Sequence, residues 1–180
     1  VWVTRQGLWR WLLKSLDRVT AHCATRVLAD SLSQRDFLVA QQVVLATRIG
    51  VLADGSISGV SLQRFRPNAA VRTALRAELN LGEQTPVLLF IGRLDRDKGL
   101  FELMDAFVEL AACEPASVLV VVGPDEESIW DELLARLGEA RSRVRRRDFT
   151  KVPEAFMAMA DCLVLPSYRE GFGSVVIEAA

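Results

Sequence analysis

The sequence predicts an α/β fold in which a parallel sheet is covered on both faces by helices. Two unbroken apolar runs, residues 86–91 and 117–122, have the length of strands, and each is followed by a glycine. Unbroken apolar runs indicate parallel strands that are buried on both faces. Between the two runs, residues 99–112 carry leucine and phenylalanine at helical spacing, which completes a β-α-β unit.

The alternation of strands and helices continues towards the C-terminus. We expect helices over residues 126–137 and 153–160, and strands over residues 144–149 and 162–165. A further helix is expected from Gly173 onward. Ligands of doubly wound sheets bind beyond the carboxyl ends of the strands, so the loops that follow the strands are the expected place for a site.

The first third of the chain predicts a shorter α/β segment. An amphipathic helix is expected over residues 2–16, a strand over 17–23, a helix over 24–38 and a strand over 42–47. Residues 50–60 are rich in glycine and serine, which is typical of a linker. We therefore divide the chain into residues 1–60, the end of one domain with its linker, and residues 61–180, a second domain. Because the sequence begins at a valine and stops within an expected helix, we expect a segment of a longer protein.

The composition excludes several classes of protein. Hydrophobic residues make up 51% and charged residues 25% of the chain, which is typical of a globular protein. No run approaches the ~20 consecutive apolar residues of a membrane-spanning helix. The net charge of −1 provides no overall positive field, so we expect no nucleic-acid partner. Three cysteines, odd in number and far apart, disfavour a disulfide framework or a metal cluster and favour a cytoplasmic location.

The most informative stretch is the loop that follows the first buried strand, residues 90–100. Gly92 permits close approach to the backbone, and Gly99 begins a helix whose free N–H groups favour an anion. Arg93 and Lys98 bracket this loop, and together they suit a diphosphate or polyphosphate. The loop lacks the P-loop pattern of ATPases. The alternative is that both cations are solvated and only offset the acidic residues between them.

A second polar loop, residues 166–178, follows the last expected strand. It carries Glu170, two glycines that permit close approach of a ligand, and then Glu178 within a helix. Eight helical residues would rise about 12 Å, which is more than the ~5–9.5 Å between the carboxyl groups of a glycosidase pair. The two acids therefore suit different parts of one extended ligand. The alternative is that Glu170 caps the helix and Glu178 is an ordinary surface residue.

Together, the two loops resemble a known family. The elements Gly-Arg-Leu-x-x-x-Lys-Gly at residues 92–99 and Glu-Gly-Phe-Gly-x-x-x-x-Glu at residues 170–178 resemble the C-terminal donor domain of the retaining glycosyltransferases of family 4. These enzymes have the GT-B fold of two Rossmann-like domains. The resemblance covers roughly residues 15–180 and implies that residues 1–60 end the acceptor-side domain, whereas residues 61–180 form a truncated donor domain.

The resemblance also implies the site residues. Arg93 and Lys98 would contact the diphosphate of a nucleotide-sugar and neutralise the leaving group, and Glu170 would hold hydroxyls of the sugar. Glu178 would bind the ribose, and the base would lie near residues 149–152. The implied catalytic residues are Glu170, Arg93 and Lys98, and the implied donor-binding residues are Gly92, Arg93, Lys98, Thr150, Phe172, Gly173, Ser174 and Glu178.

The implied activity is transfer of a hexosyl or N-acetylhexosaminyl group from a nucleotide-sugar, with UDP expected, to a glycan or lipid-linked acceptor in bacterial surface polysaccharide synthesis. The family implies attack on the front face of the sugar without a required metal or other cofactor. Most of the acceptor domain would lie upstream, and His22 does not match the position of its histidine, so we expect these 180 residues to be inactive alone. The alternative is a non-catalytic module that binds nucleotide-sugars.

Two further features leave a peripheral membrane contact open. Residues 141–147 contain five arginines, which could grip a membrane surface or a lipid-linked pyrophosphate, or could simply form a solvated edge before a strand. Trp2, Trp9 and Trp11 lie on the first expected helix. They could meet a membrane interface, or they could pack against the rest of their own domain.

Overall fold

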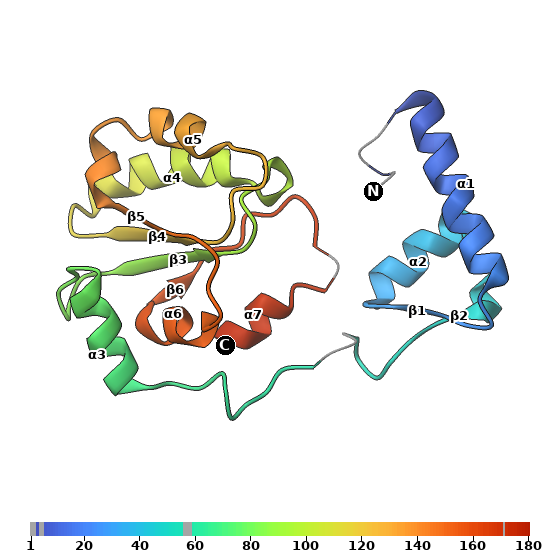
Figure 1. Cartoon of the computed structure of the whole chain (residues 1–180), viewed down its shortest axis with the longest axis horizontal. Coiled ribbons are helices and arrows are strands. Elements are labelled where there is room, and N and C mark those ends of the chain that lie inside the picture. Colours follow the sequence, from blue (N-terminus) through green and yellow to red (C-terminus); the bar gives the residue numbers. More distant parts are fainter. Residues whose placement is uncertain (1–2, 4–5, 56–58, 171) are drawn as a thin grey trace. The chain divides into compact units, whose positions relative to one another are not determined.

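The computed structural model describes residues 3, 6–55, 59–170 and 172–180 of the chain. The chain divides into two compact units, Val1–Gly59 and Val60–Ala180. Figure 1 shows the elements of both units.

The second unit is built on four parallel strands, as the sequence predicts. These are β3 (Val87–Ile91), β4 (Val118–Val122), β5 (Val144–Arg147) and β6 (Cys162–Leu163), in the order β5-β4-β3-β6. Val87 pairs with Val118 and Ile91 with Val122, so β3 and β4 begin and end level with each other. Their following loops therefore leave the sheet side by side.

Helices cover both faces of this sheet (Figure 1). Helices α4 (Leu100–Cys113) and α5 (Trp130–Arg136) pack on one face, and α3 (Ala69–Glu78) and α6 (Pro153–Met159) pack on the other. A short helix, α7 (Ser174–Ala179), follows β6. The α/β fold with a parallel sheet flanked by helices is confirmed, although α3 was not predicted from the sequence.

The unbroken apolar runs divide their side chains between the two faces. Phe90, Leu119 and Val121 belong to the core under α4 and α5, whereas Leu89, Val120 and Val122 belong to the core under α3 and α6. Every residue of β4 is buried. This two-sided burial explains why the runs are continuous and do not alternate with polar residues.

Some predicted elements are shorter in the structure. Helix α5 begins at Trp130 because the carboxylate of Asp125 accepts hydrogen bonds from the N–H groups of Ile129 and Trp130, at 2.9 and 3.1 Å. A 3-10 segment, η3 (Gly138–Arg143), then leads into β5. Strands β5 and β6 end two residues before their predicted ends.

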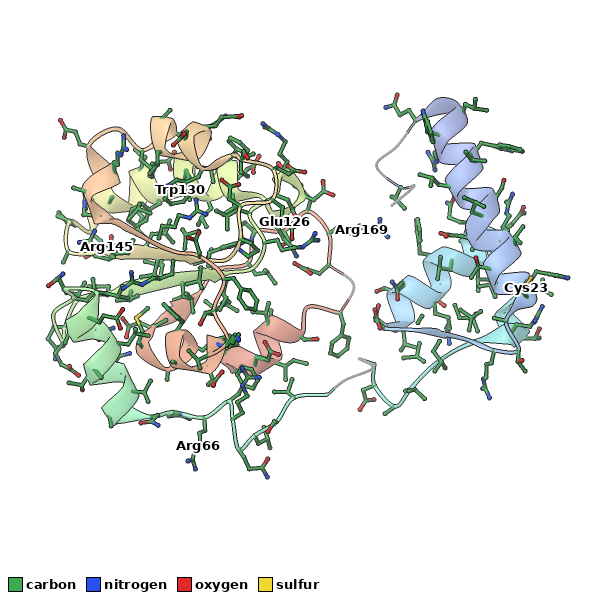
Figure 2. All side chains as sticks on the ribbon, viewed as in Figure 1. Cys23, Arg66, Glu126, Trp130, Arg145 and Arg169 are labelled. Carbon is green, nitrogen blue, oxygen red and sulfur yellow. The ribbon has the colours of Figure 1, made fainter. Side chains whose placement is uncertain are left out.

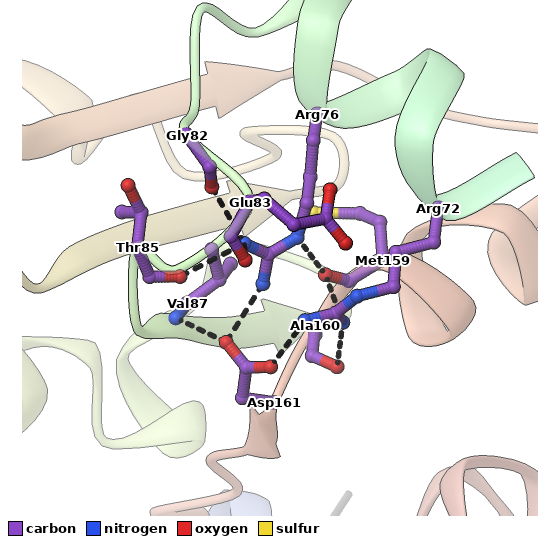
Figure 3. A network of polar contacts seen from close by, with 9 residues as sticks. All are labelled: Arg72, Arg76, Gly82, Glu83, Thr85, Val87, Met159, Ala160 and Asp161. Carbon is purple, nitrogen blue, oxygen red and sulfur yellow. Dashed lines mark hydrogen bonds and ion pairs between the residues drawn. The ribbon is translucent and has the colours of Figure 1, made fainter. Parts of the chain in front are cut away.

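A buried arginine joins three elements of the second unit (Figure 3). Arg76 of α3 is 1% exposed. Its guanidinium donates to the carboxylate of Asp161, 2.7 Å away, just before β6. It also donates to the carbonyl oxygens of Gly82, Glu83, Thr85 and Met159. The network fixes α3 against the start of β3 and the end of α6.

Asp161 is the anionic centre of this network. Its carboxylate also accepts hydrogen bonds from Arg72 and from the N–H of Val87, at 2.6 and 2.8 Å. Partial burial opposes ionisation of Asp161, but the two guanidinium groups and the Val87 N–H outweigh it and hold its pKa below the ordinary value. The carboxylate is therefore the ionised partner of two arginines.

The first unit is small. It contains α1 (Gly7–Cys23), β1 (Val27–Ala29), α2 (Leu32–Ala40), a 3-10 segment η1 (Ala46–Arg48) and β2 (Ile49–Val51), and β1 and β2 pair in parallel. Three predictions are wrong here. Residues 17–23 continue α1 because apolar side chains keep their helical spacing through Leu16 and Val19. A helix was predicted over residues 24–38, but this range includes the strand β1, and α2 begins only at Leu32, where Ser31 is the N-cap residue. A strand was predicted over residues 42–47, but β2 begins later, at Ile49.

Helix α1 turns its apolar side outward. Leu8, Trp9, Leu12, Leu16 and Val19 are exposed, and Trp11 is exposed as well. On the opposite side, Lys14 donates to the Gln41 side chain and Arg18 to the Gln42 carbonyl, each at 2.9 Å. The prediction for Trp2 falls outside the described residues.

The three cysteines all lie within the described residues. Cys23, Cys113 and Cys162 are free and exposed. In the described part of the chain, no helix has the length and apolar character needed to cross a membrane.

We predict that Arg76→Ala lowers the free energy of unfolding by about 2–3 kcal/mol, because the substitution leaves several carbonyl groups without their buried donor, whereas Asp161 keeps its ion pair with Arg72. Urea denaturation measures the change. Arg141→Ala is the matched control, since Arg141 is exposed on η3, and it is expected to cost less than about 0.5 kcal/mol. A loss below about 1 kcal/mol for Arg76→Ala would contradict the structural role of the network.

Candidate functional site

The loops beyond the carboxyl ends of β3, β4 and β5 enclose a hollow of about 390 Å³. Its lining comes from three separate segments of the chain. These residues are Ile91, Gly92, Arg93, Val122, Gly123, Pro124, Glu126, Phe149, Thr150 and Pro153. The hollow lies where the doubly wound fold predicts a ligand site.

Two glycines let the strand ends meet at the floor of this hollow. The N–H of Gly92 donates to the Val122 carbonyl and that of Gly123 to the Arg147 carbonyl, each at 2.9 Å. Gly123 has φ +144°, and a Cβ at this position would stand 1.8 Å from the carbonyl oxygen of Gly92. Only glycine therefore fits where the exits of β3, β4 and β5 are drawn together.

Arg93 supplies the positive charge of the hollow. Its guanidinium donates to Glu126, which is 3.0 Å away, and a second nitrogen lies 3.6 Å from Asp95. The hydrogen bond to Glu126 and the negative charge of Asp95 raise the pKa of Arg93 above its ordinary value. Arg93 is therefore a permanent cation at the wall of the hollow.

Lys98 and Glu170 form an ion pair between the two predicted loops. Lys98 ends a 3-10 turn, η2 (Arg96–Lys98), and its ammonium lies 2.6 Å from the carboxylate of Glu170, 72 residues later in the sequence. Burial opposes ionisation of Glu170, but the hydrogen bond from Lys98 and the charges of Lys98 and Arg93 outweigh it and lower its pKa. Glu170 is thus held ionised near both predicted cations.

Backbone packing holds these two loops together. Gly99 has φ +66°, and a Cβ there would stand 2.3 Å from the carbonyl oxygen of Pro166. The N–H of Tyr168 donates to the Asp97 carbonyl at 3.0 Å, and its hydroxyl donates to Glu102 of α4. The loop that carries Glu170 therefore rests on the turn that carries Lys98.

The remaining predicted site residues have no direct polar contact with the charged groups of Arg93, Lys98 and Glu170 among the described residues. Thr150 lines the hollow, and its hydroxyl accepts from the N–H of Val152 at 3.1 Å. Gly173, with φ +72°, precedes α7, which contains Ser174 and Glu178. Within the described part of the chain, no hydrogen bond or ion pair links Phe172, Gly173, Ser174 or Glu178 to Arg93, Lys98 or Glu170.

The structure therefore brings the predicted residues together in two groups. Gly92, Arg93 and Thr150 line the hollow, and Lys98 pairs with Glu170 beside it. Glu126, which is labelled in Figure 2 and pairs with Arg93 at the wall of the hollow, was not predicted from the sequence. The available signal was its position: it follows Gly123 at the end of β4, as Arg93 follows Gly92 at the end of β3.

The arginine-rich stretch is largely occupied by internal contacts. Arg143 donates to the carbonyl groups of Ala111 and Pro115, and Arg145 donates to that of Ser142. Arg146 pairs with Asp125 and Asp148, and Arg147 pairs with Glu78. Four of the five arginines thus have partners within the second unit, and three of them lie in β5 itself, so the stretch is not simply a solvated edge before a strand.

The remaining observations concern His22 and possible metal ligands. His22 is exposed in the last turn of α1, in the first unit. Among the described residues, no group of three or more histidine, cysteine, aspartate or glutamate side chains is arranged to hold a metal ion.

The sheet and its helices are those of a GT-B glycosyltransferase domain. The solved structure of HepE from Anabaena, in complex with UDP and glucose, matches this chain with a TM-score of 0.77 and 24% identity. The match covers 92% of this chain and 46% of HepE. This likeness establishes the fold.

Residues 71–180 match the family model of the glycosyl transferases group 1, and the chain belongs to this family. CapM of Staphylococcus aureus, a capsular polysaccharide biosynthesis glycosyltransferase, is 28% identical over 178 residues, which are 98% of this chain and 46% of CapM. TuaC of Bacillus subtilis, named as a teichuronic acid biosynthesis glycosyltransferase, is 34% identical over 121 residues, which are 67% of this chain and 29% of TuaC. The chain thus spans less than half the length of these relatives.

We predict that Gly123→Ala destabilises the chain by about 3 kcal/mol or more, because the new methyl group forces the ends of β3 and β4 apart. Thermal or urea unfolding measures the loss. Gly138→Ala is the matched control, since Gly138 also has positive φ, +51°, but has no atom within 4 Å of its Cβ position. It should cost only about 1 kcal/mol. Equal losses for the two variants would show that the close approach of the strand ends is unimportant.

Proposed function

We propose that this chain is the donor-binding part of a retaining glycosyltransferase of family 4, which transfers a hexosyl or N-acetylhexosaminyl group from a UDP-sugar. The acceptor is proposed to be a glycan or lipid-linked glycan of bacterial surface polysaccharide synthesis. One observation carries the proposal: Arg93, Lys98 and Glu170 gather at the carboxyl ends of adjacent strands, beside a hollow in a group 1 glycosyltransferase domain.

The two cations suit the departing nucleoside diphosphate. When the bond between the sugar and the diphosphate breaks, negative charge grows on the phosphate oxygen that leaves. Arg93 is a fixed cation at the hollow. Lys98 donates one hydrogen bond to Glu170, and the other N–H groups of its ammonium can donate to a phosphate. We assign both residues to stabilisation of this charge.

Glu170 suits the sugar. An ionised carboxylate accepts hydrogen bonds from two hydroxyl groups, and the pKa of Glu170 is lowered by Lys98 and Arg93 despite its burial. We propose that Glu170 orients the sugar while the acceptor attacks the same face from which the diphosphate departs. This geometry would retain the configuration at the reacting carbon.

The hollow suits the nucleoside. Phe149 and Thr150 line it, together with the backbone of Gly92 and Gly123. The structure of HepE, a fold neighbour, was solved with UDP and glucose, which supports UDP as the first nucleotide to test. We propose that Glu178 and the N–H groups of Phe172, Gly173 and Ser174 complete the contacts to ribose, sugar and phosphate.

No metal is proposed for this reaction, because Arg93 and Lys98 already supply positive charge for the diphosphate. We further propose that the whole protein acts in the cytoplasm with peripheral contact at the membrane, where lipid-linked acceptors are found. The curated relatives CapM and TuaC, both named for surface polysaccharides, support this class of acceptor.

We predict that Arg93→Ala weakens UDP binding roughly tenfold or more, since a charged hydrogen-bond donor to the diphosphate is lost. Titration calorimetry of the 180-residue chain with UDP measures the affinity. Arg141→Ala is the matched control, because it removes the same charge from an exposed position away from the hollow, and it should leave binding unchanged. Unchanged binding in Arg93→Ala would remove the diphosphate assignment.

We predict that Glu170→Ala lowers sugar transfer by the full-length enzyme at least about 100-fold while it leaves UDP binding within a few fold. Product analysis with labelled donor, and nuclear magnetic resonance of the new linkage, measure the rate and the configuration. Transfer at full rate would show that Glu170 is not catalytic. Absence of transfer by the unmodified full-length protein, with UDP still bound, would favour the non-catalytic binding module.

A further inference from the structure

Arg93 has two acidic neighbours, Asp95 and Glu126, whose side chains differ in solvent exposure. The side chain of Asp95 is 13% exposed and lies 3.6 Å from the guanidinium, whereas the side chain of Glu126 is 52% exposed and lies at 3.0 Å. Glu126 is therefore both the closer partner and the one that can move into solvent. Asp95 directly precedes the η2 turn, and its Oδ1 atom is buried without a hydrogen-bond partner in the described part of the chain.

Glu126 also lines the hollow itself. It follows β4, whereas Arg93 follows β3, and their ion pair spans the two loops at the wall of the cavity. Any diphosphate that reaches Arg93 therefore comes within a few ångströms of the Glu126 carboxylate. Two anions then compete for one guanidinium, and like charges repel at this distance.

We infer that Glu126 is an internal counter-ion that pairs with Arg93 and must be displaced by the diphosphate of the nucleotide. This inference rests on the proposed function and adds a residue that sets the affinity of the site. Displacement does not require the fold to change, because Glu126 can turn outward while Asp95 stays against Arg93. When the nucleoside diphosphate leaves, Glu126 takes its place again.

This role predicts the direction in which the UDP affinity changes when Glu126 is substituted. Removal of the negative charge at position 126 should tighten binding of UDP, because the competing anion and its repulsion are both lost. Uridine carries no phosphate and should bind equally well to all variants. A residue that only orients Arg93, or that contacts the ligand directly, would have the opposite effect, because its loss would weaken UDP binding.

The test is titration calorimetry of the 180-residue chain and its variants with UDP and with uridine, at low and high salt. Glu126→Gln should bind UDP roughly three- to tenfold more tightly than the unmodified chain, and the charge-reversing Glu126→Lys should bind more tightly still. The gain should shrink at high salt. Thermal unfolding should be nearly unchanged, since an exposed ion pair contributes little stability.

Glu109→Gln is the matched control. Glu109 is exposed on α4 and outside the lining of the hollow, so this variant makes the same change in net charge and should leave the UDP affinity as it is. Equal or weaker UDP binding in Glu126→Gln, with normal binding by the unmodified chain, would overturn the inference alone. Failure of the unmodified chain to bind UDP would overturn the proposed nucleotide site as well, so the two failures are distinguishable.

Discussion

The site depends on one close backbone contact, between Gly92 and Gly123. Strands β3 and β4 end level with each other, and the absence of a side chain on Gly123 lets its backbone reach the carbonyl of Gly92. The chain then leaves both strands at the same place and in the same direction. As a result, Arg93 and Glu126 form an ion pair at the wall of the hollow although 32 other residues separate them in the sequence.

Opposite charges balance throughout this edge of the sheet. Arg93 lies between two carboxylates, and Lys98 is paired with Glu170. The ion pairs hold the two cations in position, so under the proposed function little reorganisation would be needed for a diphosphate to replace a carboxylate. With Glu126 as the proposed counter-ion, the affinity for a diphosphate would depend on how much more strongly Arg93 binds the diphosphate than it binds Glu126, and not on the number of positive charges.

The sequence predicted the parts of the fold that depend on local patterns. Continuous burial on two faces leaves a clear signature, so the strands around Leu89 and Val120 were assigned correctly. Helix α3 was missed because its key buried residue is Arg76, and a hydropathy pattern marks an arginine as exposed. In the first unit, β1 and β2 have only three residues each, which is too short for a periodic pattern to separate strand from helix.

For the candidate site, the motif residues Arg93, Lys98 and Glu170 were recognisable because they follow strands and flank glycines. Glu126 was not, because its importance depends on the register between β3 and β4, which no local pattern records. The contact of Tyr168 with Glu102 was hidden for the same reason: it joins segments 66 residues apart through the packing of one loop on another.

Helix α1 has a practical consequence for anyone who handles this polypeptide. Leu8, Trp9 and Leu12 are exposed on this helix. An exposed apolar surface of this kind promotes self-association and adsorption to surfaces. The Val60–Ala180 unit instead encloses apolar clusters on both faces of its own sheet. If the protein aggregates, a mild detergent or a shorter polypeptide that starts near residue 60 should keep it in solution.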